Sequence, residues 1–234
     1  MQVALSKGLM MQILPLEEFI KSIPKSESSF LDTFLDLIND YLPPCSRQGP
    51  WIIGGTIRRI CNKEAPTTDI DIMFKNKDEY DDYCVWLREH GAEIINENTR
   101  NSTYKYGAWK IQPICAEFSN TLNQTLSKFD FTICQFGFDG TNLMWGDHSM
   151  EHLNEKKLVF TRTNDHVSTM RRAFKYANQG FFMDHESIGK FLKDAIKQNE
   201  KVHASAKKWE AEASSLASGG FPFGGSAKGS SYSV

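Results

Sequence analysis

Apolar and polar residues alternate along the first half of the chain in two periods, one typical of helices and one of strands. Over residues 16–42 apolar side chains recur at helical spacing until a Pro-Pro pair ends the segment. A short apolar run before a Gly-Gly pair predicts a buried strand. We therefore expect helices at 16–42, 56–62 and 78–90, and strands at 51–53 and 70–74.

The second half of the chain continues with strands and then becomes mainly helical. Strands are expected around 109–118 and 129–138, the latter followed by an Asp-Gly turn. From about residue 148 the period is helical. One helix is expected from about 165 to 179, ended by a glycine, and the next from about 187 to 216. Residues 218–234 are rich in Gly and Ser without periodicity, which predicts a disordered tail.

These elements predict an α+β protein with a mixed sheet of about five strands, backed by helices and followed by a helical C-terminal region. With 234 residues, 40% of them hydrophobic, the chain is long enough to bury a substantial core. Its net charge of −2 means that any contact with nucleic acid would come from a local basic patch.

The cysteine pattern predicts no structural metal site, and the N-terminal sequence predicts no membrane segment. The five cysteines are scattered without a Cys-x-x-Cys pair, which argues against a disulfide framework or a zinc site. The apolar stretch at 9–16 is too short to span a bilayer, lacks a cleavage site, and is followed directly by two glutamates. We expect a cytoplasmic protein with no membrane partner.

Candidate chemistry begins with two aspartates on one expected strand. Successive side chains of a strand point to opposite faces, so Asp69 and Asp71 share a face while Ile70 and Ile72 point into the core. Two neighbouring carboxylates repel each other unless a cation neutralises them, and Mg²⁺ prefers such oxygen ligands. An Asp-x-Asp pair alone is common on the polar face of an edge strand.

The preceding Gly-Gly turn gives the aspartates a more specific meaning. Gly54 and Gly55 allow close approach of the backbone to a triphosphate, and N–H groups at the start of the following helix can bind its oxygens. Arg58 can add charge-assisted hydrogen bonds to phosphate. A strand, a Gly-Gly helix start and an Asp-x-Asp strand together indicate metal-dependent nucleotide chemistry.

A two-metal site needs a further acidic ligand, and two candidates stand in apolar surroundings. Glu117 lies near the end of the expected strand at 109–118, and Asp130 lies in the one at 129–138. Periodicity does not choose between them.

At these positions the sequence resembles the polymerase-β-type nucleotidyltransferase superfamily, in particular the head domain of class II CCA-adding tRNA nucleotidyltransferases and bacterial poly(A) polymerases. Residues 54–59 and 69–71 are similar to that family's Gly-Gly-x-Val-Arg-Asp and Asp-x-Asp motifs. Residues 128–135, Lys-Phe-Asp-Phe-Thr-Ile-Cys-Gln, resemble its Arg-Arg-Asp-Phe-Thr-Ile-Asn-Ala motif. The resemblance extends over about 50–181.

The resemblance implies a nucleotidyltransferase palm and a role for each candidate. Glu117 becomes the third metal carboxylate beside Asp69 and Asp71, and Asp130 belongs to the motif that packs beside the nucleotide. Arg171 and Arg172 lie, with a nearby lysine, on an Arg-rich helix next to the site. Two Mg²⁺ ions and a nucleoside triphosphate (NTP) such as ATP are implied, with transfer of a nucleotide to an RNA 3′ end, as in tRNA processing, and release of pyrophosphate.

The resemblance also implies a division of the chain. A helical segment would occupy 1–48, the catalytic domain 49–162, the helical region 163–217 and the disordered tail 218–234.

Two departures leave the acceptor and the base open. Lys128 and Phe129 replace the family's Arg-Arg pair, and the base-reading Glu-Asp-x-x-Arg element has no match at 165–169. A reduced or divergent relative, such as one encoded by a virus, would show these departures. Two alternatives stay open beside transfer to RNA. One is modification of a different acceptor by a toxin-like or regulatory enzyme, and the other is a non-catalytic nucleotide-binding module.

Overall fold

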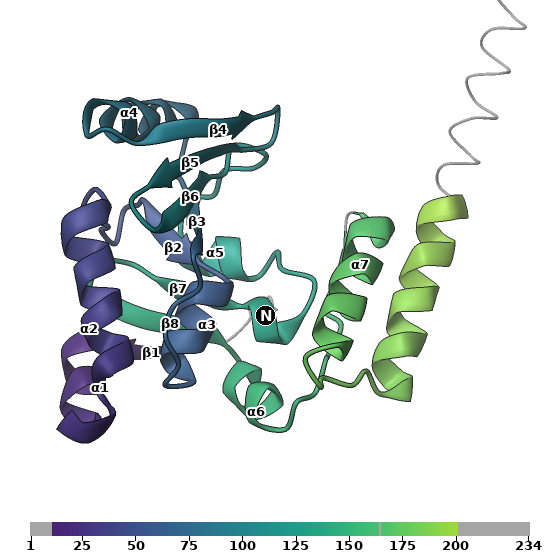
Figure 1. Ribbon diagram of the computed structural model, residues 1–234. Helices are drawn as coiled ribbons and strands as arrows, with labels where there is room; N and C mark the ends of the chain where they lie inside the picture. Colours follow the sequence, from purple (N-terminus) through teal and green to yellow (C-terminus); the bar gives the residue numbers. More distant parts are fainter. Residues whose placement is uncertain (1–10, 164, 201–234) are drawn as a thin grey trace, which may run out of the picture. The chain divides into compact units, whose positions relative to one another are not determined.

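The computed structural model describes residues 11–163 and 165–200 (Figure 1). One compact unit ends at Phe191 and a second begins at Leu192. No helix among the described residues is long and apolar enough to cross a membrane. The predicted tail at 218–234, and the part of the last expected helix beyond residue 200, lie outside the described residues.

A single mixed sheet of eight strands forms the centre of the first unit. Its order is β1-β8-β7-β2-β3-β6-β5-β4, and every pair of neighbours is antiparallel except β3 and β6. The strands are β1 (Met11–Pro15), β2 (Trp51–Ile53), β3 (Asp69–Met73), β4 (Glu93–Glu97), β5 (Ser102–Tyr106), β6 (Trp109–Pro113), β7 (Phe136–Phe138) and β8 (Asn142–Gly146). The predicted α+β fold with a mixed sheet is confirmed, and the sheet is larger than the expected five strands.

Seven labelled helices accompany the sheet among the described residues. They are α1 (Leu16–Ser22), α2 (Ser29–Asp36), α3 (Gly55–Cys61), α4 (Lys77–Glu89), α5 (Leu122–Leu126), α6 (Ser149–Asn154) and α7 (His166–Ala177). A further helix occupies residues 185–200. The expected helix at 16–42 is interrupted around Pro24, because proline supplies no backbone N–H to continue the helical ladder.

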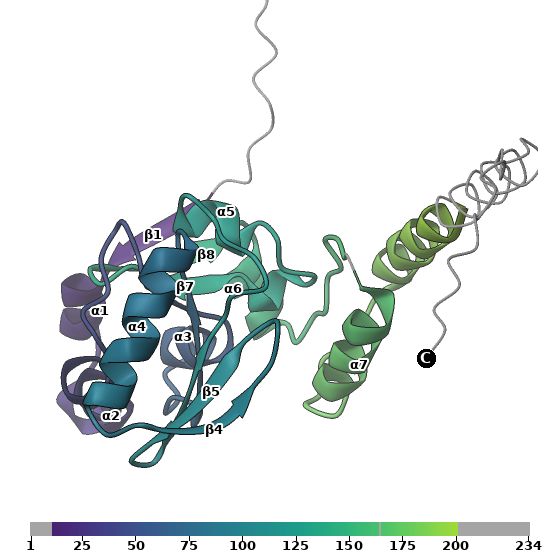
Figure 2. The ribbon, with the colours of Figure 1, turned by 90° about the horizontal axis from the view of Figure 1, so that it is seen from above.

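The two faces of the sheet bury different clusters. Alternation along β2 directs Ile52 into the larger core, which also holds Phe34 of α2. Trp51 and Ile53 point the other way, into a smaller cluster with Leu122 of α5. Figure 1 accordingly shows α2 and α5 on opposite sides of the strands. Figure 2, seen from above, shows β4 and β5 at one end of the sheet and β1 at the other.

The strand expected at 129–138 is shorter than predicted. Only Phe136–Phe138 is a strand, while Thr132–Cys134 forms a 3₁₀ turn. The preceding segment bonds instead to a distant one, since the Thr132 N–H donates to the Val159 carbonyl at 3.1 Å. The apolar residues that suggested a strand are buried by these tertiary contacts, so Asp130 lies in a loop rather than on a strand.

Glu117 is also off the sheet. β6 ends at Pro113, and the chain then leaves the strand, with the N–H groups of Cys115 and Ala116 both donating to the Arg100 carbonyl at 2.9 Å. The strand expected to reach 118 therefore ends before it brings Glu117 into line with the aspartates of β3.

Candidate functional site

The turn between β2 and α3 is shaped by its first glycine. Gly54 has φ +73° and ψ −130°, a region that residues with a side chain rarely adopt. Its N–H donates to the Phe136 carbonyl at 2.8 Å, which ties the turn to β7. A Cβ atom at Gly54 would lie 3.7 Å from Asp71 Oδ2, whereas one at Gly55 would meet no atom within 4 Å. The turn therefore passes beside the Asp71 carboxylate and leaves open space at the helix start.

The two aspartates share the face of β3 that the larger core does not use. Ile70 and Ile72 are fully buried in that core, while Asp69 is exposed and Asp71 is partly buried on the opposite face. Burial, and after it the charge of Asp69, raise the pKa of Asp71 to about 6, while Lys175 opposes the shift. A cation held between the two carboxylates would offset the repulsion between their negative charges.

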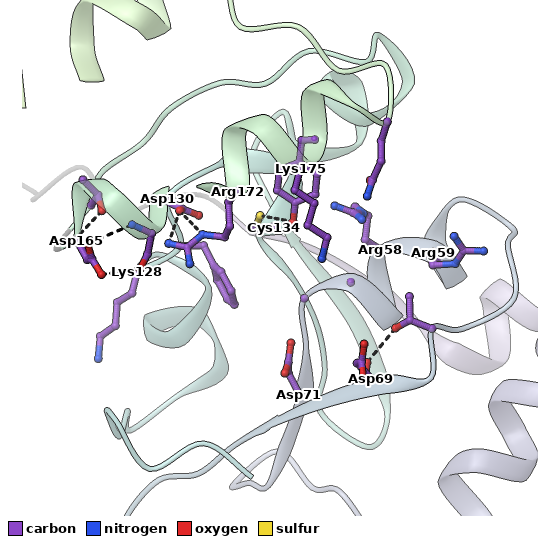
Figure 3. A pocket seen from close by; sticks show the side chains of 18 of the residues that line it. Arg58, Arg59, Asp69, Asp71, Lys128, Asp130, Cys134, Asp165, Arg172 and Lys175 are labelled. Atoms are coloured by element: carbon purple, nitrogen blue, oxygen red, sulfur yellow. Dashed lines mark hydrogen bonds and ion pairs between the residues drawn. The ribbon is translucent and has the colours of Figure 1, made fainter. Parts of the chain in front are cut away.

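A cavity of about 620 Å³ opens in front of this turn and strand (Figure 3). Its described lining contains six cationic and four acidic side chains together with small and aromatic residues. The lining residues are Gly54, Gly55, Arg58, Arg59, Thr67, Asp69, Asp71, Arg100, Lys128, Phe129, Asp130, Cys134, Thr163, Asp165, Ser168, Arg172, Lys175, Tyr176 and Gln179. The cavity can accommodate a polyanion together with a cation bound to its carboxylates.

Helix α7 forms one wall of the cavity and is fastened to the sheet domain by side chains. Asp165 caps its N-terminus by accepting hydrogen bonds from the Val167 and Ser168 N–H groups. The Arg172 guanidinium pairs with the buried Asp130 carboxylate at 2.5 Å. Figure 3 shows Asp130, Arg172 and Asp165 gathered at one end of the cavity, away from Asp69 and Asp71.

Arg58 of α3 lies against an aromatic ring of α7. Its guanidinium carbon lies 5.0 Å from the centre of the Tyr176 ring, and the Tyr176 hydroxyl lies 3.2 Å from the Cys134 thiol. Within the described residues, the buried Arg58 Nη1 has no hydrogen-bond partner. A buried guanidinium N–H without an acceptor is costly. Arg58 also lines the cavity, so its positive charge is available to a phosphate there.

The structure brings together most of the residues proposed from the sequence. Those lining the cavity are Gly54, Gly55, Arg58, Asp69, Asp71, Asp130 and Arg172. Glu117 is not among them, although its carboxylate pairs at 2.7 Å with Nζ of Lys128, which does line the cavity. Arg171 is exposed and is likewise absent from the lining.

Arg100 and Lys110 are among the cations at the site that were not candidates from the sequence. Arg100 reaches the cavity from the loop between β4 and β5, and no local pattern marks it. Lys110 lies opposite Asp69 on β6, with its Nζ 3.9 Å from Asp69 Oδ1. The parallel pairing of β3 and β6 creates this contact, and that pairing could not be read from the sequence.

The two carboxylates of β3 could supply part of the ligand shell of a divalent metal ion. Mg²⁺ is usually bound in proteins through one or two carboxylates, with substrate phosphates completing its coordination. Asp69 and Asp71 supply such a pair on the cavity wall. Among the described residues there is no group of three or more Asp, Glu, His or Cys side chains placed to hold a metal. Any further ligand would therefore come from a substrate, from water or from a rearranged side chain.

The sequence of residues 24–156 matches the model of the Gabija anti-defense 2 family. That range is more than half of the chain. The chain belongs to the Gabija anti-defense 2 family. The matched range contains the Gly-Gly turn, both aspartates of β3 and the Asp130 loop, so these features fall within the family's own region. No curated protein matches this sequence.

Solved structures show where else this fold occurs. The structure of a CCA-adding enzyme in complex with ATP is similar, with a TM-score of 0.53 and 16% sequence identity. The matched region covers 80% of this chain and 46% of the enzyme's chain. The Thermotoga maritima CCA-adding enzyme complexed with tRNA has a TM-score of 0.50 at 18% identity, with the same coverage. This chain thus spans less than half the length of these structures. It shares the nucleotidyltransferase fold with them, as the sequence motifs predicted.

Proposed function

We propose that this protein is a magnesium-dependent nucleotidyltransferase that transfers a nucleoside monophosphate from an NTP to the 3′ end of an RNA, releasing pyrophosphate. One observation carries the proposal. Asp69 and Asp71 stand side by side in a cavity whose other walls are a Gly-Gly helix start and the cations Arg58, Arg172 and Lys175. The solved CCA-adding enzymes with this fold bind ATP and tRNA, which supports the same classes of ligand here.

The triphosphate would lie against the start of α3. The Gly54 N-cap has no capping side chain, so the first N–H groups of the helix are available to phosphate oxygens. Arg58 and Lys175 both line the cavity and would offer their positive charges to the phosphates. The Arg172–Asp130 pair would hold α7 against the nucleotide at the far end of the cavity.

The carboxylates would hold the metal ions and so set the reaction geometry. Two Mg²⁺ ions, when bound, would neutralise the triphosphate and lower the pKa of the acceptor hydroxyl. Asp69 and Asp71 would hold these ions against the triphosphate, which would place the α-phosphate for in-line attack by that hydroxyl. Glu117 is the proposed third metal ligand, and it could hold an ion only if its carboxylate were released from Lys128; Asp69 likewise would have to part from Lys110.

The purified protein should label RNA when it is incubated with Mg²⁺, each labelled NTP in turn, and total RNA. We expect label at RNA 3′ ends, and its loss in Asp69→Ala and Asp71→Ala variants that keep the wild-type melting temperature. Asp82→Ala, which removes an exposed carboxylate from α4, is the matched control and should label normally. Normal labelling by either site variant would refute the assignment.

A different acceptor is the second candidate, and the family description favours it. A protein of the Gabija anti-defense 2 family is expected to act against a defence system, for which an acceptor on a protein or on another RNA would serve. In the same experiment, label that migrates with protein supports this candidate.

A non-catalytic nucleotide-binding module is the third candidate, because Glu117 and Asp69 are both contacted by lysines in this structure. NTP binding without any labelled product would support it.

A further inference from the structure

A second hollow, of about 330 Å³, adjoins the catalytic cavity and shares one residue with it, Lys128. We call it the basic groove. It is formed by the segment after β3, the loop that leads into α5, α5 itself and the segment before α7. Its lining residues are Lys75, Phe118, Ser119, Asn120, Gln124, Ser127, Lys128 and Arg162.

The groove differs in charge from the catalytic cavity. Lys75, Lys128 and Arg162 are cationic, and no acidic side chain is among the described residues that line it. The catalytic cavity, in contrast, is lined by four aspartates that suit metal-bound phosphates. A lining with three cations and no carboxylate of its own has a net positive charge, which attracts an anion without a metal ion.

Lys128 is held at the boundary between the two hollows by three oxygen acceptors. Its Nζ lies 2.7 Å from Glu117 Oε1, 3.0 Å from Ser119 Oγ and 3.3 Å from the Phe118 carbonyl. In Figure 3 its side chain extends away from Asp69 and Asp71. The Glu117 carboxylate beside the groove is therefore already paired with Lys128. Among the described residues, the hydrogen-bond partner of Lys75 Nζ is the Gln48 amide oxygen at 3.4 Å, so the charge of Lys75 can be presented to a ligand.

The uncharged lining suits a sugar-phosphate chain. Asn120, Gln124 and Ser127 carry amide and hydroxyl groups, the kinds of side chain that commonly contact phosphate and sugar oxygens. Phe118 is half-buried in the wall and offers an apolar surface of the kind on which bases stack. Cations, neutral donors and one aromatic ring in a hollow that continues from the reaction site match a polynucleotide strand.

We propose that the basic groove binds the backbone of a single-stranded acceptor RNA, immediately upstream of the 3′-terminal nucleotide that enters the catalytic cavity. This inference rests on the proposed function for the identity of the acceptor. Lys75 and Arg162 contact backbone phosphates, and Lys128 marks the point where the strand passes from the groove to the reaction site. Binding to the groove requires neither NTP nor metal.

The test measures binding of a fluorescently labelled single-stranded RNA oligonucleotide to the full chain, without NTP or Mg²⁺, over a range of salt concentrations. For Lys75→Glu we expect affinity to fall about tenfold, and the slope of log affinity against log salt to decrease by about 0.7 to 1. Lys75→Arg keeps the charge and should bind like the wild type. The matched control is Lys21→Glu, the same charge reversal on an exposed position of α1 that lines neither hollow.

The outcomes separate this inference from the proposed function. Three results would each overturn the basic groove as an acceptor site. They are wild-type RNA affinity in Lys75→Glu, an equal loss of affinity in Lys21→Glu, and no RNA binding by the wild type. Melting temperatures measured in parallel establish that each variant is folded. If RNA binding depends on Lys75 but no nucleotide is transferred to any RNA, the groove stands and the transferase assignment fails.

Discussion

At the scale of single residues, the ionised Asp71 carboxylate that the proposed metal site needs is also the form that destabilises the folded protein. Its folded-state pKa of about 6 lies above its ordinary value of 3.8, mainly because the carboxyl is desolvated. Between these two values the folded protein binds the proton more tightly than the unfolded chain. The free energy of unfolding therefore falls as pH rises through this window, and ionised Asp71 is destabilising above pH 6.

Replacing Asp71 with Asn should therefore stabilise the protein at pH 7.5 and have little effect at pH 4. The expected gain is on the order of 1–3 kcal/mol, since each unit of pKa shift corresponds to about 1.4 kcal/mol. Urea titrations at both pH values measure it. Asp82→Asn, an exposed change of the same charge, should show no such pH dependence. Mg²⁺ should stabilise the wild type at pH 7.5 but not Asp71→Asn, and equal stability of wild type and variant at pH 7.5 would contradict the account.

The two glycines of the turn should separate folding from ligand binding. Gly54→Ala forces a Cβ onto φ +73° and ψ −130°, which should cost about 1–3 kcal/mol of stability. Gly55→Ala lies at the first position of α3 with open space around its Cβ, so its stability should hold or rise by up to about 1 kcal/mol. That methyl group enters the space assigned to the triphosphate, so NTP affinity should fall. Thermal melts and NTP titrations check both variants, and unchanged NTP binding in Gly55→Ala would refute the assigned cradle.

At the scale of elements, α7 depends on a few side-chain contacts to form the cavity wall. Asp130 is 5% exposed and its charge is paired with Arg172, whose side chain is 44% exposed. Removing Arg172 leaves a buried carboxylate without its partner, which typically costs about 3–5 kcal/mol. Arg172→Ala should therefore be strongly destabilising and should speed amide hydrogen exchange in α7. Asp130→Asn in the same chain should restore part of the loss, and a double variant no more stable than Arg172→Ala would show that the pair does not fasten α7.

The elements that sequence could predict are those specified by nearby residues. β2, the Gly-Gly start of α3, β3 and α4 each combine a local period with a local stop signal, and all four were predicted close to their observed bounds. β4 has no buried residue, because it is the outer strand of the sheet, and so it shows no alternation to detect. β1 is an edge strand too, and only its pairing with β8 defines it.

The residues of the candidate site also divide into those that nearby sequence identifies and those that only the folded sheet brings to the site. The residues within the Gly-Gly and Asp-x-Asp motifs could be identified because a few adjacent positions suffice to recognise them. Glu117 was assigned by resemblance, and its pairing with Lys128 depends on the path of the chain after Pro113. Lys110 and Arg100 come to the site through the pairing of β3 with β6 and the loop between β4 and β5. Contacts of this kind depend on the whole sheet.

At the scale of the whole molecule, a net charge of −2 coexists with a site rich in cations, because the fold gathers them from distant segments. Arg58, Arg100, Lys128 and Lys175 come from α3, a loop, the segment before β7 and α7. The described surface of α4, in contrast, carries the exposed aspartates of a helix that lines neither hollow. The proposed division of the chain at residues 48, 162 and 217 stays a prediction.

The extent of chain needed for this site can be tested by truncation. All residues that line the cavity precede residue 180, but the core of the same unit extends further, because Phe191 packs on Phe160 with ring centres 5.4 Å apart. Ser187 is also buried, and its hydroxyl accepts a hydrogen bond from the Phe160 N–H. A chain of residues 1–200 should therefore melt and bind NTP like the full chain.

A chain of residues 1–184 loses Phe191 and Ser187 from this core, and should be destabilised by at least about 3 kcal/mol, as expected for deleting a buried Phe side chain. Its NTP affinity should fall only as far as the folded fraction does, since the cavity lining is intact. Denaturant titration and NTP binding of both truncated chains measure these effects. Equal stability of the two chains would show that the helix at 185–200 adds nothing to the first unit. Loss of NTP binding in the 1–200 chain would place part of the nucleotide site beyond residue 200.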